Sequence, residues 1–242
     1  MRAVILAGGK GTRLRPFTTT LPKPLVPVGD RAILDVVLAR LKQSGVTHVT
    51  MAVNHLAHLI MSYYGDGERL GLKIDYSMED KPLSTIAPLK LIPDLPEVFF
   101  VMNGDVLTDL DYRKLYDTHV AGDNDITVAT YERDTKIDFG VLRTDERTRR
   151  IVGFEEKPVY HFNVSMGVYV ISRRLLEIVP GDEPFGFDDL MLACIRDGRK
   201  AVAYPHDGYW LDIGRPSDYE KASEAAAELL GEDPPSERAE DA

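Results

Sequence analysis

The sequence predicts an α/β protein built as a three-layer sandwich, with a mainly parallel central sheet between helices. Short apolar segments alternate with amphipathic ones through the first hundred residues, a pattern typical of parallel sheets covered by helices on both faces. The second half is richer in strand-like segments, which polar turns separate. With 242 residues and 44% hydrophobic content, the chain can bury a substantial core.

The first half alternates strands and helices in order. The apolar run 2–6 predicts a buried strand that ends in a glycine cluster. Apolar residues at i, i+3, i+4 and i+7 predict a helix over 32–44 that ends at Gly45. We also expect strands over 47–53, 72–77 and 98–102, and a helix over 55–64. Because carboxyl ends of parallel strands share one edge, the glycine cluster and Asp105 should lie close together.

The second half is predicted to contain strands over 125–131, 140–143, 151–154 and 165–171 and helices over 173–179, 187–197 and 217–230. Asp188 and Asp189 suit the start of the second of these helices. Cys194 lies in apolar surroundings, which favours a buried thiol. Residues 231–242 contain no apolar side chain larger than alanine, so we expect an acidic, disordered tail.

Positive charge is concentrated at the start of the chain. Residues 1–29 contain five basic residues and no acidic one, in a protein of net charge −10. The nearby glycines, Gly8, Gly9 and Gly11, allow positive φ and let backbone N–H groups approach an anion. We interpret this loop as a polyphosphate site. The alternative is a strand-to-helix turn with solvated basic residues, and the absence of acidic residues argues against it.

Two common phosphate loops are excluded by spacing. No Gly-Lys-Ser/Thr follows Gly8 or Gly9 at the distance that a P-loop requires. A dinucleotide-binding fingerprint that starts at Gly9 would place its third glycine at Leu14. The loop must therefore be of another kind.

Composition excludes several classes of protein. No apolar run approaches the roughly 20 residues of a membrane span, and the N-terminus does not read as a secretion signal. A single cysteine cannot form a disulfide within the chain. The acidic balance argues against general nucleic-acid binding. We expect a soluble cytoplasmic protein without membrane or nucleic-acid partners.

Residues 6–14 (LAGGKGTRL), followed by 22–25 (PKPL), resemble the signature of the sugar-phosphate nucleotidyltransferases, the enzymes that make NDP-sugars. Segments 103–105 (NGD), 155–158 (EEKP) and 210–214 (WLDIG) resemble the same family in order, so the resemblance covers about residues 1–225. The sequence is most similar to the mannose-1-phosphate guanylyltransferase-like branch.

The resemblance implies a Rossmann-like nucleotide-diphospho-sugar transferase fold with a strand-rich sugar-binding part. A single catalytic domain would occupy residues 1–230, with a nucleotide-binding half over about 1–110 and a sugar-phosphate-binding half over about 111–230. It would condense an NTP, here GTP, with a mannose- or heptose-like 1-phosphate in a Mg²⁺-dependent reaction, and relatives suggest a homodimer. Because a sugar phosphate is already ionised near neutral pH, catalysis requires positioning and charge neutralisation rather than a general base.

The resemblance also assigns roles to individual residues. Arg13, Lys23 and Asp105 are the expected catalytic residues, and Asp105 and Asp212 would hold Mg²⁺. The residues expected to contact the nucleotide are Leu6, Ala7, Gly8, Gly9, Gly11, Thr12, Arg13, Lys23, Glu79, Pro82, Ser84 and Asn103. The residues expected to contact the sugar phosphate are Gly104, Glu156, Lys157 and Gly167.

Each of these side chains also has a structural interpretation. Taken alone, Asp105 could cap a helix or close a turn, Asp212 could be a buried hydrogen-bonding group, and 155–158 could be a solvated turn. The functional interpretation rests on their occurring together. His55 and His58 lack partners that would complete a metal site, and we expect both on the surface.

The segment 79–87 departs from the family pattern, because Ser84, Ile86 and Ala87 replace Gly, Ala and Gly. A similar departure places Met166 before Gly167, where the family often has Ala. The added bulk raises the hypothesis of an unusual sugar or cyclitol phosphate.

Two rival functions follow from other features. A glycosyltransferase of the related nucleotide-sugar fold would use an Asp-x-Asp motif, which 109–111 formally provides. A non-catalytic nucleotide-sugar sensor could keep the same binding loop, although the presence of all the expected catalytic residues argues against it.

Overall fold

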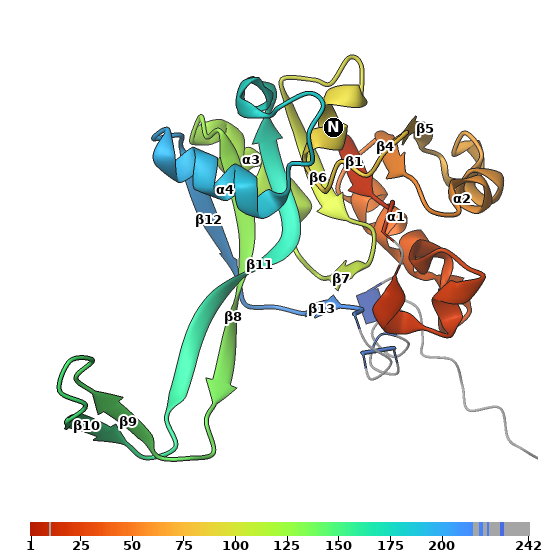
Figure 1. Ribbon diagram of the computed structural model, residues 1–242. Coiled ribbons are helices and arrows are strands. Elements are labelled where there is room, and N and C mark those ends of the chain that lie inside the picture. The colour runs from red at the N-terminus through yellow and green to blue at the C-terminus, as the bar shows by residue number, and fades with distance from the viewer. Residues whose placement is uncertain (10, 215–217, 220–221, 223–227, 230–242) are drawn as a thin grey trace, which may run out of the picture.

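The computed structural model describes residues 1–9, 11–214, 218–219, 222 and 228–229 (Figure 1). Lys10, most of the predicted helix over 217–230 and the predicted tail over 231–242 lie outside the described residues. Within the described part of the chain, no helix is long and apolar enough to cross a membrane.

One seven-stranded sheet runs through the molecule, in the order β12-β8-β11-β6-β1-β4-β5. Its strands are β1 (Arg2–Leu6), β4 (His48–Val53), β5 (Lys73–Met78), β6 (Val98–Asn103), β8 (Ile126–Lys136), β11 (Val159–Ser172) and β12 (Ala201–His206). Every neighbouring pair is parallel except those that β11 makes with β6 and β8. The predicted mainly parallel sheet is therefore confirmed, with β11 as its antiparallel strand.

Helices cover both faces of this sheet and give the predicted three layers (Figure 1). The α-helices are α1 (Ile33–Gln43), α2 (Ala57–Tyr64), α3 (Tyr112–Ala121) and α4 (Phe187–Arg196). The 3-10 helices are η1 (Thr12–Leu14), η2 (Phe17–Thr19), η3 (Lys23–Leu25), η4 (Glu68–Leu70), η5 (Ala87–Leu91) and η6 (Arg173–Ile178). The short strands outside the main sheet are β2 (Pro27–Val28), β3 (Arg31–Ala32), β7 (Val106–Thr108), β9 (Val141–Thr144), β10 (Ile151–Glu155) and β13 (Trp210–Asp212).

Two hydrophobic cores lie on opposite faces of the sheet. Phe100 and Met102 of β6 join the core that contains α1 and α2, whereas Phe99 and Val101 join the core that contains α4 and η5. Successive side chains of a strand point to opposite faces. A strand that serves both cores must therefore be apolar throughout, which is why 98–102 is an unbroken apolar run.

The start and middle of α4 agree with the sequence. Asp189 Oδ2 accepts a hydrogen bond of 2.8 Å from the backbone N–H of Gly186, which satisfies an N–H group that the helix itself leaves unpaired. Cys194 is fully buried, as predicted, and burial raises the pKa of its thiol.

Several elements differ from the predictions. The segment predicted as a helix over 173–179 is the 3-10 helix η6, while α3, β12 and β13 were not predicted. In α3 only Tyr112, Leu115 and His119 are buried, so its apolar periodicity is weak. In β12 every second residue is exposed to solvent and the others are half-buried, which leaves little hydrophobic signal.

Strands β8 and β11 extend well beyond their predicted ends. Their outer halves leave the sheet as a two-stranded ribbon, which carries the β9–β10 hairpin at its far end (Figure 1). We call residues 132–163 the arm. In Figure 1 the hairpin lies apart from the central sheet and from all four α-helices.

Candidate active site

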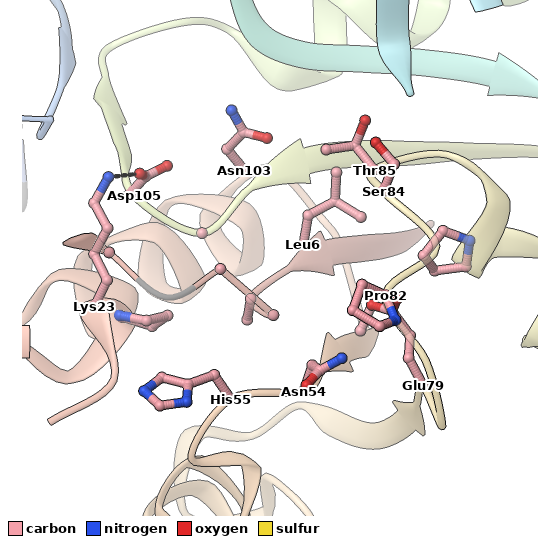
Figure 2. A pocket seen from close by; sticks show the side chains of 18 of the residues that line it. Leu6, Lys23, Asn54, His55, Glu79, Pro82, Ser84, Thr85, Asn103 and Asp105 are labelled. Atoms are coloured by element: carbon pink, nitrogen blue, oxygen red, sulfur yellow. Dashed lines mark hydrogen bonds and ion pairs between the residues drawn. The ribbon is translucent and has the colours of Figure 1, made fainter. Parts of the chain in front are cut away.

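A cavity of about 580 Å³ opens at the carboxyl ends of β1, β4, β5 and β6 (Figure 2). Its wall includes every residue predicted to contact the nucleotide, from Leu6 to Asn103, together with Gly104 and Asp105. Leu6 pairs with Asn103 across the parallel β1–β6 ladder, and the Gly104 N–H donates to the Leu6 carbonyl at 3.2 Å. The expected closeness of the glycine loop and Asp105 is therefore a direct result of strand register.

The glycine loop turns sharply at Gly11, which begins η1 with φ +58°. A Cβ at this position would lie 2.9 Å from Thr18 Cγ2, and the Thr18 hydroxyl donates to the Gly11 carbonyl at 2.7 Å. Gly8 and Gly9 do not have positive φ. Their contributions differ, because a Cβ on Gly8 would lie 3.3 Å from Asn54 Cβ whereas one on Gly9 would meet nothing within 4 Å.

Lys23 joins the two predicted metal-binding carboxylates. Its ammonium forms an ion pair with Asp105 and lies 4.0 Å from Asp212 Oδ1. The side chains of Lys23 and Asp105 are 13% and 17% exposed, so this pair is largely removed from water. Asp212 reaches this place because β13 pairs with β7, which begins directly after Asp105, and Val106 lies opposite Asp212.

The carboxylates influence each other electrostatically. Burial, and then the nearby negative charge of Asp105, raise the pKa of Asp212, against the opposing effects of Lys23 and Arg13. The Arg13 guanidinium also lies beside Gly214, where a Cβ would be 3.3 Å from Arg13 Nη1. Arg13, Lys23, Asp105 and Asp212 thus form one charged cluster at the edge of the cavity. Two carboxylates held this close to each other favour a cation between them.

Gly167 packs against Asn103, a residue of the cavity wall. It has φ +75° within a register shift of the β8–β11 pairing, and a Cβ there would lie 2.6 Å from Asn103 Nδ2. The neighbouring Met166 is buried, and its carbonyl accepts a 3.2 Å hydrogen bond from Trp210 Nε1. Gly167 therefore contacts a residue of the cavity wall without lining the cavity itself.

Residues 2–228 match the family described as Nucleotidyl transferase. The chain belongs to this family. It is 36% identical over 232 residues to the mannose-1-phosphate guanylyltransferase of Mycobacterium tuberculosis, covering 91% of this chain and 63% of that protein. It is 32% identical over 227 residues to the mannose-1-phosphate guanyltransferase of Candida albicans, covering 90% and 62%. The chain thus spans less than two thirds of the length of these relatives.

Among solved structures, HddC from Yersinia pseudotuberculosis complexed with GMP-PN is similar, with a TM-score of 0.70 and 28% identity over 92% of this chain and 98% of that chain. The fold is that of the nucleotide-diphospho-sugar transferases, as the resemblance implied.

The departures in segment 79–87 do not all affect the cavity. Ile86 and Ala87 are fully buried and belong to the core on the α4 side. Only Ser84 among the three lines the cavity, and it adopts φ +69°, a conformation that suits glycine. The loop is held by Glu79, whose carboxylate accepts a 2.8 Å hydrogen bond from the Leu83 N–H. The larger side chains at 86 and 87 therefore fill the core. The expectation that they alter the substrate site was wrong for these two positions.

Sequence reasoning missed several residues of the cavity wall, namely Pro24, Ala52, Asn54, His55, Thr85 and Pro88. His55 was expected on the surface with His58. It instead precedes the first turn of α2 and lines the cavity between Asn54 and Lys23, as Figure 2 shows, whereas His58 is exposed. Its position after β4, at the same edge as the glycine loop, was the available signal.

The structure does not bring the predicted sugar-phosphate pair to this cavity. Glu156 and Lys157 are exposed and follow β10 on the arm, and the described residues that line the cavity all lie between Leu6 and Asp105. The Asp-x-Asp motif of the rival function is also elsewhere. Asp111 caps α3 through a 2.9 Å hydrogen bond from the Lys114 N–H, and Asp109 lies 2.9 Å from His206 Nε2.

Proposed function

We propose that this chain is a sugar-1-phosphate nucleotidyltransferase, an enzyme of the EC 2.7.7 type, that condenses an NTP with a sugar 1-phosphate to give an NDP-sugar and pyrophosphate. The observation that carries the proposal is the convergence of Lys23, Asp105 and Asp212 beside the cavity of the glycine loop. The nucleotidyl transferase family match over residues 2–228 supports it.

The chemistry needs little from the protein beyond position and charge. A sugar-phosphate oxygen attacks the α-phosphorus of the NTP, the bond from that phosphorus to the bridging oxygen breaks, and pyrophosphate leaves with the electron pair. Bringing two polyanions into line is the main barrier. Backbone N–H groups of the glycine loop and the cationic side chains of Arg13 and Lys23 would neutralise the phosphates.

Asp105 and Asp212 fit a divalent cation. Their oxygens are of the type that Mg²⁺ prefers, and the negative charge of Asp105 adds to burial in raising the pKa of Asp212, as expected for neighbouring carboxylates. We therefore assign Mg²⁺ to this pair. When bound, it would supply charge neutralisation at the reacting phosphate.

For the substrates, we propose GTP and a mannose- or heptose-like 1-phosphate. Relatives named as mannose-1-phosphate guanylyltransferases and the HddC complex with GMP-PN support a guanine nucleotide. Residues 1–110 would form the nucleotide half of a single catalytic domain over 1–230. Residues 111–230 would form the sugar-phosphate half, in which Gly167 supports Asn103 of the cavity wall. Glu156 and Lys157 would contact the sugar phosphate from the arm, outside the cavity of the glycine loop. A cytoplasmic location and a homodimer, which relatives suggest, complete the proposal.

The test measures pyrophosphate release from five NTPs, each with several sugar 1-phosphates and Mg²⁺. Arg13→Ala and Asp212→Asn should each lower kcat/KM by about 10²–10³-fold, the loss expected when one transition-state charge contact is removed. Asp109→Asn is the matched control and should keep wild-type turnover. Glycosyl transfer from an NDP-sugar would assign the chain to the rival class, and tight NTP binding without turnover would indicate a sensor.

A further inference from the structure

Trp210 of β13 and two side chains of β8 meet where the arm leaves the sheet. Trp210 is half-buried, and its indole N–H donates to the Met166 carbonyl at 3.2 Å. The centroid of the Tyr131 ring lies 5.3 Å from that of the Trp210 ring. The Arg133 guanidinium lies over the same indole, 5.5 Å from its centroid. These contacts hold an arginine of the arm against a strand that also carries Asp212.

Strand alternation explains why Tyr131 and Arg133 both reach this ring. They are two residues apart on β8, so their side chains point to the same face of the ribbon. The acidic neighbours Glu132 and Asp134 point to the opposite face, where Asp134 lies 2.6 Å from His161 Nδ1. Among the residues that the structure describes, Arg133 forms no ion pair with a carboxylate. Its positive charge is therefore available to a ligand.

Trp210 places this arginine close to the charged cluster. Trp210 and Asp212 are two residues apart on β13, so their side chains point to the same face of that strand and their backbones are about 7 Å apart. Asp212 lies beside Lys23 and Asp105 at the edge of the cavity. A ligand that begins at the charged cluster and extends along this face of β13 reaches the Trp210 ring and then Arg133.

A sugar would extend in this direction. Gly167 packs against Asn103 of the cavity wall, and it directly follows Met166, the residue that holds the indole of Trp210. Under the proposed function the 1-phosphate lies at the charged cluster, so the sugar ring lies beside Trp210. The end of the sugar that is remote from the 1-phosphate then faces Arg133.

The Arg133 side chain is suited to an anion at this place. A guanidinium keeps its positive charge at physiological pH and presents N–H donors in a planar fork that fits a carboxylate or a phosphate. The contact with Trp210 is made through the face of the ring and uses none of these donors. Because the ring already holds the cation in position, less conformational entropy is lost when a ligand binds.

We propose that the sugar 1-phosphate used by this enzyme carries a second anionic group, a carboxylate or a phosphate remote from the 1-phosphate, and that Arg133 binds this group. The inference rests on the proposed function, because it names the class of sugar that the proposed reaction uses. A sugar 1-phosphate without a second acid would leave Arg133 without a partner.

The experiment measures pyrophosphate release with the best NTP and Mg²⁺ from mannose 1-phosphate, mannose 1,6-bisphosphate and mannuronic acid 1-phosphate. The wild type should show a kcat/KM about 10–100-fold higher for an acidic sugar than for mannose 1-phosphate, which is the range expected for a charge-assisted contact. The two acidic sugars distinguish a phosphate from a carboxylate as the preferred group.

Arg133→Gln should bring the ratio of kcat/KM for the acidic sugar to that for mannose 1-phosphate close to 1. Arg133→Lys keeps the charge but loses the planar fork, so it should keep part of the preference. The matched control is Arg113→Gln, because Arg113 is also exposed but pairs with Asp117 on α3. It should keep the wild-type ratio. If Arg133 only supported Trp210, its loss would lower kcat/KM for all three sugars by the same factor, and the inference would be wrong.

Isothermal titration of the same three sugar phosphates with Mg²⁺ separates this inference from the proposed function, because binding needs no turnover. Pyrophosphate release without a preference for an acidic sugar, or with a preference that persists in Arg133→Gln, overturns the inference and leaves the proposed function in place. Binding of an acidic sugar that depends on Arg133 but yields no pyrophosphate would support the anion site and reject the proposed reaction. Neither release nor binding with any of the three sugars would reject both.

Discussion

The ammonium of Lys23 lies 4.0 Å from Asp212 Oδ1 while it forms its ion pair with Asp105. One lysine thus compensates two carboxylates that the chain separates by about half its length. Replacement of Lys23 by Gln should leave Asp105 without its ion-pair partner and Asp212 with Arg13 as its remaining nearby cation. We expect a loss of on the order of 2 kcal/mol of unfolding free energy, because Asp105 is largely buried, and a fall of about 10²-fold or more in kcat/KM.

The measurements for Lys23→Gln are urea unfolding and pyrophosphate release. Lys73→Gln is the matched control, because Lys73 is 67% exposed and pairs with Asp75 at the surface. Such exposed pairs contribute little. Equal effects of the two substitutions would contradict a special role for Lys23.

Asp212→Asn should raise the stability of the protein while it lowers its activity. Its raised pKa means that the folded protein binds a proton there more readily than the unfolded chain does. The charged carboxylate therefore costs stability, and this cost develops as pH rises through the window between the unfolded and folded pKa values and persists above it. Since Asp212 is 43% exposed, the gain in Tm at pH 7 should be only about 1–2 °C. Calorimetry at pH 7 and at pH 3 checks this, because the gain should vanish at pH 3.

Mg²⁺ should raise the Tm of the wild type but not that of Asp212→Asn, if the carboxylate helps to hold the ion. A Mg²⁺-dependent shift of equal size in both proteins would place the metal elsewhere.

Gly11 and Gly9 make a matched pair within one loop. Gly11→Ala forces a Cβ 2.9 Å from Thr18 Cγ2 at φ +58°, so it should cost about 1–2 kcal/mol. Gly9→Ala meets nothing within 4 Å and should keep the unfolding free energy within about 0.5 kcal/mol. If a nucleotide phosphate approaches the Gly9 backbone, this variant should nevertheless weaken NTP binding in isothermal titration. Unchanged NTP affinity in both variants would contradict the loop's assignment.

Ser84 holds a backbone conformation that glycine adopts at lower cost. Ser84→Gly should raise Tm by about 1–3 °C through relief of this strain. Ser84→Ala keeps the Cβ and should give no such gain. Both variants remove the Ser84 hydroxyl from the cavity wall. If both change the ratio of kcat/KM for GTP to that for UTP, the hydroxyl selects the base. A change confined to Ser84→Gly would assign it to backbone position.

His119 should make folding sensitive to acid. The Ser172 hydroxyl donates to the Asn124 carbonyl and so accepts from His119 Nε2, while Thr127 accepts from Asn124 and donates to His119 Nδ1. This network fits the neutral ring. Burial, reinforced by the Arg174 charge, lowers the pKa of His119 to about 4.

The lowered pKa of His119 should make the protein less stable at acidic pH. Below about pH 6.5 His119 binds a proton in the unfolded chain but not in the folded protein. The free energy of unfolding therefore falls as pH drops toward 4, in total by on the order of 2–3 kcal/mol. Urea unfolding at intervals from pH 7 to pH 4 should show this slope in the wild type. His119→Gln should flatten it, whereas the exposed His58→Gln should leave it unchanged. A parallel slope in all three proteins would assign acid sensitivity to other groups.

The sequence was sufficient for the parts of the fold that have strong local signals. Residues 3–6 and 98–102 are apolar because each strand serves both cores, and the predicted strands appear as β1 and β6. Most of the cavity wall followed from the resemblance at 6–14, 22–25, 79–87 and 103–105, together with the rule that parallel strands place their carboxyl ends at one edge.

The remaining features depend on tertiary context that no local pattern contains. Ile86 and Ala87 face the core rather than the cavity because of how η5 packs. His55 reaches the cavity through the position of β4. The place of Glu156 depends on β8 and β11 continuing past the sheet, and the polar residues of the ribbon give no sign of where the sheet stops.

The position of β11 also constrains how the molecule can be made. The four strands β6, β1, β4 and β5 are complete once residue 103 has left the ribosome, yet β6 pairs on its other side with β11, whose matching residues begin at Val168. During the intervening synthesis the inner edge of a fully apolar strand has no partner. Nascent chains stalled in this interval should be the ones that chaperones capture and that aggregate when chaperones are scarce.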